Sequence, residues 1–299
     1  MLSSIAAHAT TFRSSAEARS NHPHVPLHKE LRGIALAFES DQFCVQVLTT
    51  GGRGGPIVEA EIREAQRLRH DVFTGEFGAH LSSTSNGIDE DIYDAWCDHL
   101  IVRDKASRQV VGTYRIVRPE VAARLGYYAD TEFFTMRLSS IKPNLLEFGR
   151  SCIHPDFRSG PVIMLLWTAL ARYMIEGGFE HVMGCASVSM RDGGHQAASL
   201  FHRIGNDHAA SPEFRVFPRN PLPLERLTCT LQVEAPPLIR GYLRLGAKVC
   251  GDPAWDADFN TADFFMLLTL SKMNPRYARH FGIAAPADRS AVADFRQAA

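Results

Sequence analysis

Several features that would assign this sequence to a class directly are absent from it. Its six cysteines include no C-x-x-C pair and its 13 histidines lack metal-ligand spacing, so we expect neither disulfides nor a zinc or other metal site. Basic and acidic residues nearly cancel, 32 against 33, and no stretch is strongly basic. Without a basic patch there is no electrostatic basis for binding DNA or RNA, and we expect no nucleic-acid partner.

Long apolar runs are also missing. The longest, 161–170, is about half of what a bilayer span requires. Residues 1–30 are rich in Ser, Ala, His and Arg and contain no continuous apolar stretch of the kind found in secretory signals. We therefore expect a cytoplasmic protein in which any membrane contact is peripheral, at the inner face. Residues 1–40 are expected to be a disordered leader and residues 284–299 a flexible tail.

Nucleotide-binding loops are absent as well. The glycine run at 51–55 lacks the Lys-Ser/Thr of a P-loop, and no G-x-G-x-x-G follows a strand, so we interpret the run as a flexible connector. The composition, 45% hydrophobic and 22% charged, is typical of a globular protein with a sizeable core.

What the sequence does contain is the patterning of a single α/β domain over residues 41–283. Residues 99–103 and 109–117 alternate as two strands joined by a polar turn, which predicts a hairpin. Residues 189–234 include four of the chain's prolines and are expected to form an irregular insertion. The other elements that we expect are strands at 43–50, 145–154, 179–188, 247–250 and 263–270, and helices at 58–73, 120–126, 161–176 and 236–245, the last ended by Gly246.

Two segments carry candidate chemistry. The first, 88–100, concentrates five carboxylates, which suits a cationic substrate such as an amine; these are Asp89, Glu90, Asp91, Asp94 and Asp98. The alternative is a solvated loop whose aspartates cap turns. The second, 145–152, places Glu147 and Arg150 on a short apolar strand. Desolvation there would raise the pKa of a carboxyl group and produce a base that works near neutral pH, whereas the alternative is a structural ion pair between the two.

The element order resembles the acyl-CoA N-acyltransferase (GNAT) fold, which implies a mixed, splayed β-sheet flanked by helices. In that family the fourth strand bulges and splays from its neighbour beside the pantetheine arm of the donor. Gly149 is a plausible bulge residue, because an isolated glycine in a strand often marks a bulge or a close backbone approach.

A more specific resemblance comes from short motifs in a fixed order. The chain contains R-x-x-x-F at 69–73, D-x-x-D at 91–94, G-x-x-R at 112–115 and E-x-x-R at 147–150, which is similar to the acyl-homoserine-lactone autoinducer synthases. Segments 97–100, 147–155 and 274–277 resemble the hemolysin-like L-ornithine N(alpha)-acyltransferases, and the similarity runs from about residue 40 to 283. This implies transfer of a 3-hydroxyacyl group from acyl carrier protein to the α-amine of L-ornithine, giving lyso-ornithine lipid. The resemblance implies no cofactor beyond the donor's own phosphopantetheine.

The resemblance also assigns catalytic roles. Glu147 is expected to be the base, the backbone at Gly149 is expected to bind the thioester oxygen, and Tyr242 matches the tyrosine that protonates the leaving thiolate. A tyrosine on a helix more commonly packs in a core, so packing is the alternative for Tyr242. Cys152 and His154 share one strand face and suggest a Cys-His nucleophile, but no orienting acid is evident.

For the acceptor, Asp91 and Asp94 are three residues apart and would present paired carboxylates to an ammonium group. Arg115 or Arg69 could bind the substrate carboxylate, and Arg150 is assigned to the same site. In the autoinducer branch these motifs order the N-terminal part over the active site, which is the alternative to direct contact.

For the donor, the loop at 158–163 is a degraded form of the Q/R-x-x-G-x-G/A loop that holds the pyrophosphate of CoA. Only one glycine remains in this loop, and its proline lacks the backbone N–H that could bind a phosphate oxygen. We therefore expect acyl carrier protein, which carries a single phosphodiester, to be bound by Arg158, Gly160 and Val162, although the degraded loop could equally reflect drift.

Three further readings stay open. Trp167, Leu166, Leu170, Tyr173 and Met174 line a helix and could contact an acyl chain, although such a stripe is usually core. The acceptor could be another amine, such as glycine or S-adenosylmethionine. A catalytically silent lipid- or carrier-binding protein on the same fold is the alternative outside enzymes.

Overall fold

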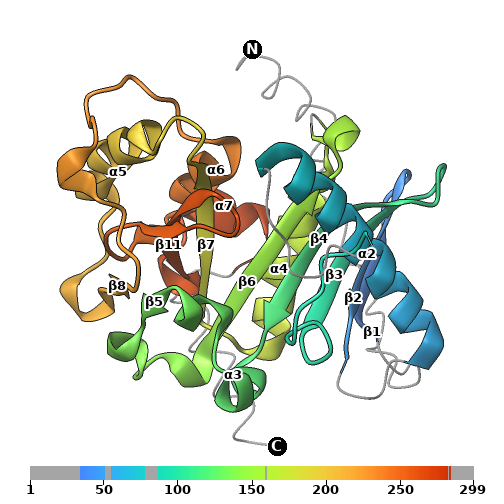
Figure 1. Ribbon diagram of the computed structural model, residues 1–299. Coiled ribbons are helices and arrows are strands. Elements are labelled where there is room, and N and C mark those ends of the chain that lie inside the picture. Colours follow the sequence, from blue (N-terminus) through green and yellow to red (C-terminus); the bar gives the residue numbers. More distant parts are fainter. Residues whose placement is uncertain (1–33, 51–54, 78–86, 159, 282, 284–299) are drawn as a thin grey trace, which may run out of the picture. The chain divides into compact units, whose positions relative to one another are not determined.

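The computed structural model describes residues 34–50, 55–77, 87–158, 160–281 and 283 (Figure 1). Three expected segments lie wholly or mostly outside these residues. They are the leader, up to residue 33, the tail at 284–299 and the glycine-rich connector at 51–54. Within the described residues, Ile34–Glu39 forms strand β1, so this part of the expected leader is in the sheet. None of the helices in the described ranges is both long and apolar enough to cross a membrane.

The described strands form one main sheet in the order β1-β2-β3-β4-β6-β7-β11-β10, with β9 also paired to β11. Every neighbouring pair is antiparallel except β6 and β7, which are parallel. The mixed sheet expected from the sequence is therefore confirmed. Its other strands are β2 (Phe43–Leu48), β3 (Asp98–Asp104), β4 (Val110–Val117), β6 (Leu145–Ile153), β7 (His181–Ser189), β9 (Lys248–Val249), β10 (Ala254–Asp256) and β11 (Thr261–Thr269).

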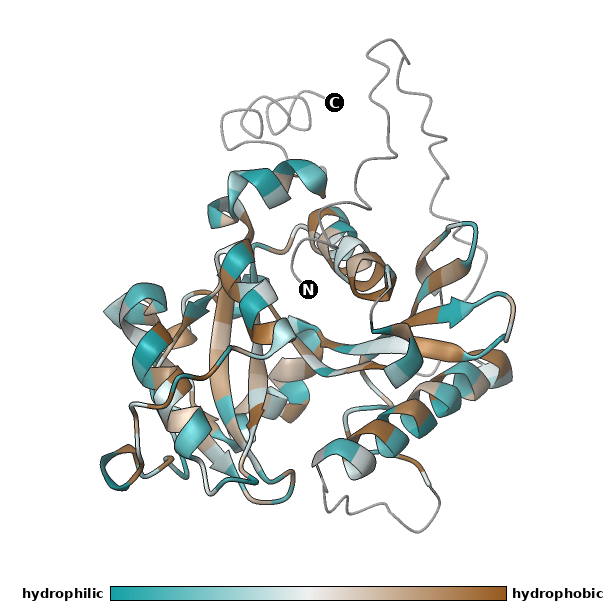
Figure 2. Ribbon diagram, turned by 90° about the horizontal axis from the view of Figure 1, so that it is seen from above, coloured by the Kyte–Doolittle hydropathy of each residue, from teal (hydrophilic) through white to brown (hydrophobic). Residues whose placement is uncertain are grey.

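Helices α2 (Gly55–Phe77) and α4 (Val162–Gly177) cover opposite faces of this sheet (Figure 1). The buried side of α2 repeats at helical spacing through Val58, Ile62 and Ala65 and packs on Ile101. Figure 2 shows the long helix α2 with alternating polar and apolar residues. The sheet thus has a buried layer on each side, which requires an apolar stripe on both helices.

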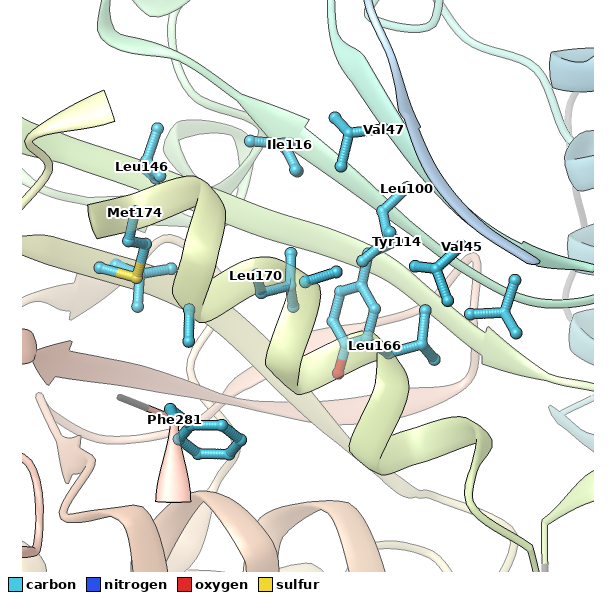
Figure 3. Packing of buried hydrophobic residues seen from close by; sticks show 14 of the residues in the cluster. Val45, Val47, Leu100, Tyr114, Ile116, Leu146, Leu166, Leu170, Met174 and Phe281 are labelled. Carbon is cyan, nitrogen blue, oxygen red and sulfur yellow. The ribbon is translucent and has the colours of Figure 1, made fainter. Parts of the chain in front are cut away.

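The buried side of α4 repeats every fourth residue through Val162, Leu166, Leu170 and Met174. Leu166 and Leu170 point toward the sheet, where Tyr114 lies between them (Figure 3). Three members of the stripe that could have contacted an acyl chain are therefore core residues, although Leu170 and Met174 also line a cavity described below.

One part of the expected insertion is regular. Helix α5 (His195–His208) occupies the middle of 189–234, and Ala197, Leu200 and Ile204 are buried on one side of it against β7 and β11. Their spacing of three and four residues is the helical signal that the surrounding prolines obscured. The prediction of an irregular segment was wrong at these residues.

Helix α6 (Pro237–Leu245) confirms the expected helix end, because Gly246 follows it with a φ of 103°. Smaller elements complete the described chain. They are α3 (Pro119–Leu125), α7 (Pro275–His280), the two-stranded pair β5 (Phe133–Phe134) and β8 (Phe217–Pro218), and 3-10 helices η2 (Tyr128–Thr131), η3 (Met136–Leu138), η4 (Lys142–Asn144), η5 (Pro155–Phe157), η6 (Pro212–Phe214), η7 (Leu224–Arg226) and η8 (Leu270–Lys272).

Candidate active site

The parallel strands β6 and β7 pair only at one end. Their register covers residues 145–147 and 181–183, and no further pairing between these two strands occurs in the described chain. Gly184 marks the end of the pairing, because a Cβ on it would lie 2.4 Å from the carbonyl oxygen of Phe148. The splay predicted from the resemblance is confirmed, and it exposes backbone between the two strands.

Replacing Gly184 by Ala should destabilise the protein by about 1–3 kcal/mol, because the added methyl group forces the two strands apart. Gly149→Ala is the matched control, since a Cβ there meets nothing within 4 Å. Chemical denaturation midpoints of the two variants would measure the difference. Equal midpoints would show that the approach at Gly184 imposes no steric limit.

A bulge in β6 interrupts its pairing with β4 next to the splay. Cys152 pairs with Thr113 and Gly149 pairs with Arg115. An advance of three residues along β6 therefore corresponds to an advance of only two residues along β4. The left-handed residue of the bulge is Arg150, with a φ of 50°, and Gly149 is not in that region. The expectation that Gly149 supplies the bulge conformation was therefore wrong, although the bulge is where the resemblance implied it.

Arg150 is held in this unfavourable backbone conformation by its side chain. Its guanidinium is 3.1 Å from Asp89 Oδ2 and 3.1 Å from Asp91 Oδ2. It also lies over the rings of Tyr128 and Phe259, at 4.7 and 4.9 Å from their centroids. Left-handed geometry at a non-glycine residue costs on the order of 1–3 kcal/mol, so these contacts must offset it.

Glu147 is buried, and its carboxylate is bound by backbone rather than by an arginine. Tyr128 N–H donates to Oε2 and Ala129 N–H donates to Oε1, each at 2.7 Å. Burial raises the pKa of Glu147 to about 7, although both hydrogen bonds and the nearby Arg115 act in the opposite direction. No ion pair between Glu147 and Arg150 forms in the described structure, so the structural alternative was wrong. The environment is the one expected of a base near neutral pH.

The aspartates of the acidic segment belong to a buried ionic network. The Arg69 guanidinium contacts Asp94 through two hydrogen bonds of 2.8 and 3.0 Å, and its Nε is 2.8 Å from Asp89 Oδ2. Arg115 donates to Asp91 Oδ1 at 2.6 Å. Burial alone would raise the pKa of Asp94, but Arg69 and Arg115 outweigh it and hold that pKa well below its usual range.

The charges of this network balance, since three arginines face Asp89, Asp91 and Asp94. His99 is fully buried beside them, and burial lowers its pKa to about 4, so it adds no charge at neutral pH. No carboxylate of the network is left for a substrate ammonium group. The geometry favours the alternative, in which these residues hold segment 88–98 against β4 and β6.

Tyr242 lies in a cluster of hydrogen-bonding side chains on the opposite face of the sheet. Its hydroxyl is 2.7 Å from that of Tyr114, and Trp167 Nε1 donates to Tyr114 at 3.3 Å. Burial raises the pKa of both tyrosines, so their hydroxyls stay protonated. Tyr114, on β4, was missed from the sequence because only the fold brings it to α6.

An apolar cavity that is partly open to solvent adjoins this cluster. Phe148 and Gly184 border it from the splayed strands, Trp167 from α4 and Tyr242 from α6. The other residues lining it are nearly all apolar: Leu170, Ala171, Met174, Val182, Met183, Cys185, Leu245, Ala247, Met266, Leu268, Met273 and Phe281. A hydrocarbon chain fits such a lining.

The expected donor residues lie where β6 leads into α4. Arg158 is exposed and pairs with Glu76 at 2.5 Å, and Gly160 is exposed. Val162 is fully buried and packs against Gly112, so its side chain is not available to a ligand. Ser159, between them, lies outside the described residues.

Cys152 does not have the environment of a nucleophile. Its thiol is buried against α2, 3.6 Å from the carbonyl oxygen of Leu68, and burial raises its pKa to about 12. His154 Nδ1 accepts a hydrogen bond from the N–H of Asp156 instead of contacting the thiol. The hypothesis of a Cys-His pair was wrong.

This chain is similar to several known proteins. A family model described as an acetyltransferase (GNAT) domain matches residues 68–168. An L-ornithine N(alpha)-acyltransferase of Brucella abortus (strain 2308) is 35% identical over 249 residues, 76% of this chain and 86% of the relative. One of Rhizobium meliloti (strain 1021) is 35% identical over 240 residues, 75% and 81% of the two chains. The solved acyl-homoserine lactone synthase BjaI is 15% identical, with a TM-score of 0.47 and coverage of 80% and 89%.

Proposed function

Because the chain belongs to the L-ornithine N(alpha)-acyltransferase family, we propose that it transfers a 3-hydroxyacyl group to the α-amine of L-ornithine, giving lyso-ornithine lipid. It is an acyltransferase with a GNAT domain. The substrates are an acyl thioester and an amino acid.

The observation that carries the proposal is the position of Glu147 at the splay. Glu147 and Phe148 are consecutive in β6, so their side chains point to opposite faces of the sheet. Phe148 borders the apolar cavity, whereas Glu147 faces η2 on the other side. An acyl chain in the cavity and an amine beside Glu147 would meet at the backbone between the two strands.

The reaction then requires one nucleophilic addition and one elimination. The α-nitrogen attacks the thioester carbon and loses a proton to the Glu147 carboxylate, which burial has made basic enough to accept it. Backbone N–H groups at the bulge, including that of Gly149, bind the oxyanion. The C–S bond breaks, and the departing thiolate takes a proton from the Tyr242 hydroxyl. Tyr114 orients this hydroxyl through their 2.7 Å hydrogen bond.

For the donor, we propose acyl-phosphopantetheine carried by acyl carrier protein. Support comes from the loop before α4, where Pro161 removes one backbone donor and Gly160 is the single remaining glycine. A single phosphodiester needs fewer N–H donors than a pyrophosphate. Arg158, in this loop, and Arg172, on α4, are both exposed and carry the positive charge that an acidic carrier protein would contact.

Turnover with acyl carrier protein should fall as salt increases from about 0.1 to 1 M, where the Debye length drops from ~10 to ~3 Å, because charge attraction speeds encounter. Arg158→Gln and Arg172→Gln should lower kcat/KM and weaken its salt dependence. Arg226→Gln, at another exposed arginine, is the control. Equal kcat/KM for acyl-CoA and acyl carrier protein, insensitive to salt, would exclude the proposed donor.

Mass spectrometry of lipid extracts from cells expressing the protein tests the function itself. A lipid whose mass equals ornithine plus a 3-hydroxy fatty acid minus one water should accumulate, and it should be absent with Glu147→Gln. Accumulation of an acylated amine other than ornithine would identify a different acceptor for the same chemistry. Unchanged extracts in the presence of folded protein would favour a non-catalytic carrier-binding role.

A further inference from the structure

Outside the residues assigned so far, three carboxylates converge at one end of the sheet. Glu132 follows η2, Asp256 ends β10 and Asp263 lies in β11, and one oxygen of each is within 4.8 Å of the others. Asp263 is 4% exposed, and its Oδ1 accepts a hydrogen bond from Thr261 Oγ1 at 3.1 Å. Negative charge gathered in a partly buried place is unfavourable unless a cation accompanies it or a proton neutralises it.

This acidic cluster of Glu132, Asp256 and Asp263 forms no ion pair with a Lys, Arg or His of the described chain, in contrast to the balanced network around Arg69. In addition, Glu132 Oε2 is buried and has no hydrogen-bond partner there. Burial raises the pKa of both Glu132 and Asp263; the neighbouring Asp263 and Asp256 raise the pKa of Glu132 further, whereas hydrogen bonds from Ser187 and Glu132 oppose the rise at Asp263. A buried acceptor beside two further carboxylates suits a cationic ligand that brings its own N–H groups.

Residues on one face of β7 lie between Glu147, the proposed base, and this acidic cluster. Glu147 is the strand neighbour of Met183, and the thiol of Cys185, two residues further along, lies near Glu132; burial and the charge of Glu132 raise the pKa of that thiol. Asp263 pairs with the next residue on that face. Since two residues of a strand advance roughly 7 Å, Glu132 lies about that far along the strand from the level of Glu147.

The short helix η2 gives a similar distance between Glu147 and Glu132. The N–H of Ala129 donates to Glu147, and the carbonyl oxygen of Ala129 accepts the N–H of Glu132 at 3.2 Å. Three residues of 3-10 helix rise roughly 6 Å. The α- and δ-nitrogens of extended ornithine, separated by four carbon atoms, are also roughly 6 Å apart.

We propose that the acidic cluster binds the δ-ammonium group of the acceptor amino acid while the α-amine lies beside Glu147. This rests on the proposed function and deepens it, because it assigns the residues that select a dibasic acceptor. Each N–H of the ammonium can donate to a different carboxylate, and such charge-assisted hydrogen bonds are the strong ones. Norvaline, which is ornithine without the δ-nitrogen, gains none of them.

The test compares kcat/KM for ornithine and norvaline in the purified full chain with one acyl donor. The wild type should prefer ornithine by about 10- to 100-fold, the range expected for hydrogen bonds to a charged group. Glu132→Gln and Asp263→Asn should each lower this preference about tenfold or more, with kcat/KM for norvaline nearly unchanged. Glu59→Gln, an exposed carboxylate on α2, is the control and should keep the wild-type ratio.

The variants also have a readout separate from turnover. Because each removes a carboxylate from an unbalanced group, both should melt at or above the wild-type temperature, and ornithine should raise their melting temperature less than that of the wild type. A wild-type enzyme that acylates norvaline as well as ornithine, or folded variants with an unchanged preference, would overturn the inference and leave acyl transfer standing. Absence of acyl transfer to any amine would remove the proposed function and the inference with it.

A divalent metal ion is the other ligand that three carboxylates suit. The two ligands are distinguished by repeating the comparison of ornithine with norvaline after treatment with a chelator and after addition of Mg²⁺ or Ca²⁺. An ornithine preference that persists in chelator supports the proposal. A preference that disappears with chelator and returns with the metal would overturn it, because the cluster would then be a metal site.

Discussion

Replacing Glu147 by Gln should lower kcat/KM for ornithine by about 10²- to 10⁴-fold, the usual contribution of a general base. The amide fits the same space but cannot accept the amine's proton. Below about pH 7 the wild-type carboxyl group is itself protonated, so wild-type activity should fall as pH decreases through that value. The variant should lose this dependence.

Stability gives a second check on Glu147. Burial raises its pKa from 4.5 to about 7, so the folded state favours the protonated form. The associated stability is fully present below about pH 4.5 and is lost as the pH rises through 7, a change of about 3 kcal/mol by linkage. Glu147→Gln should abolish this slope in denaturation experiments between those pH values.

Asp130→Asn is the matched control, because Asp130 Oδ2 also accepts a backbone N–H at the start of η2, from Tyr127 at 3.1 Å. It disturbs the same short helix without removing the proposed base, so it should keep most of the turnover. If Glu147→Gln melts like the wild type and turns over nearly as fast, Glu147 holds η2 in place and is not the base.

Replacing Arg69 by Met should destabilise the protein by about 3–5 kcal/mol, the typical cost of leaving one side of a buried ionic group unpaired. Arg69 is 0% exposed, and its loss leaves Asp94 and Asp89 with only part of their positive partners. Arg115 and Arg150 remain, but neither can reproduce the paired hydrogen bonds to Asp94. Urea denaturation would measure the change in the free energy of unfolding.

Arg63→Met is the control for this effect. Arg63 also lies on α2 but pairs with Glu90 at the surface, at 3.6 Å, and exposed pairs contribute about 0–1 kcal/mol. If the two variants lose similar amounts of stability, the buried network is not the framework that holds 88–98. If Arg69→Met is as stable as the wild type but has a raised KM for ornithine, Arg69 binds the substrate instead.

The sequence predicted the order of the main strands and helices because their hydrophobic patterns are local. It also located Glu147, since an acidic residue inside an apolar strand is visible without the fold. It left open whether Asp91 and Asp94 bind substrate or hold the fold, because their arginine partners come from α2, β4 and β6. A pattern of carboxylates shows charge but not which cation neutralises it.

The bulge shows the same limit. A glycine is the residue that most easily adopts a left-handed conformation, so Gly149 was the natural prediction. Arg150 adopts it instead because Asp89 and Asp91, about sixty residues earlier in the chain, hold its side chain. The acidic cluster was missed for a related reason, since Glu132 and Asp263 are far apart in sequence and meet only across η2 and β11.

The most direct test of the central claim is transfer from a defined acyl thioester to L-ornithine labelled with ¹⁵N at the α-position alone. Tandem mass spectrometry of the product should show the new amide on the labelled nitrogen, with the δ-nitrogen as a free amine. An amide on the unlabelled δ-nitrogen, or no ornithine product from folded protein, would contradict the account.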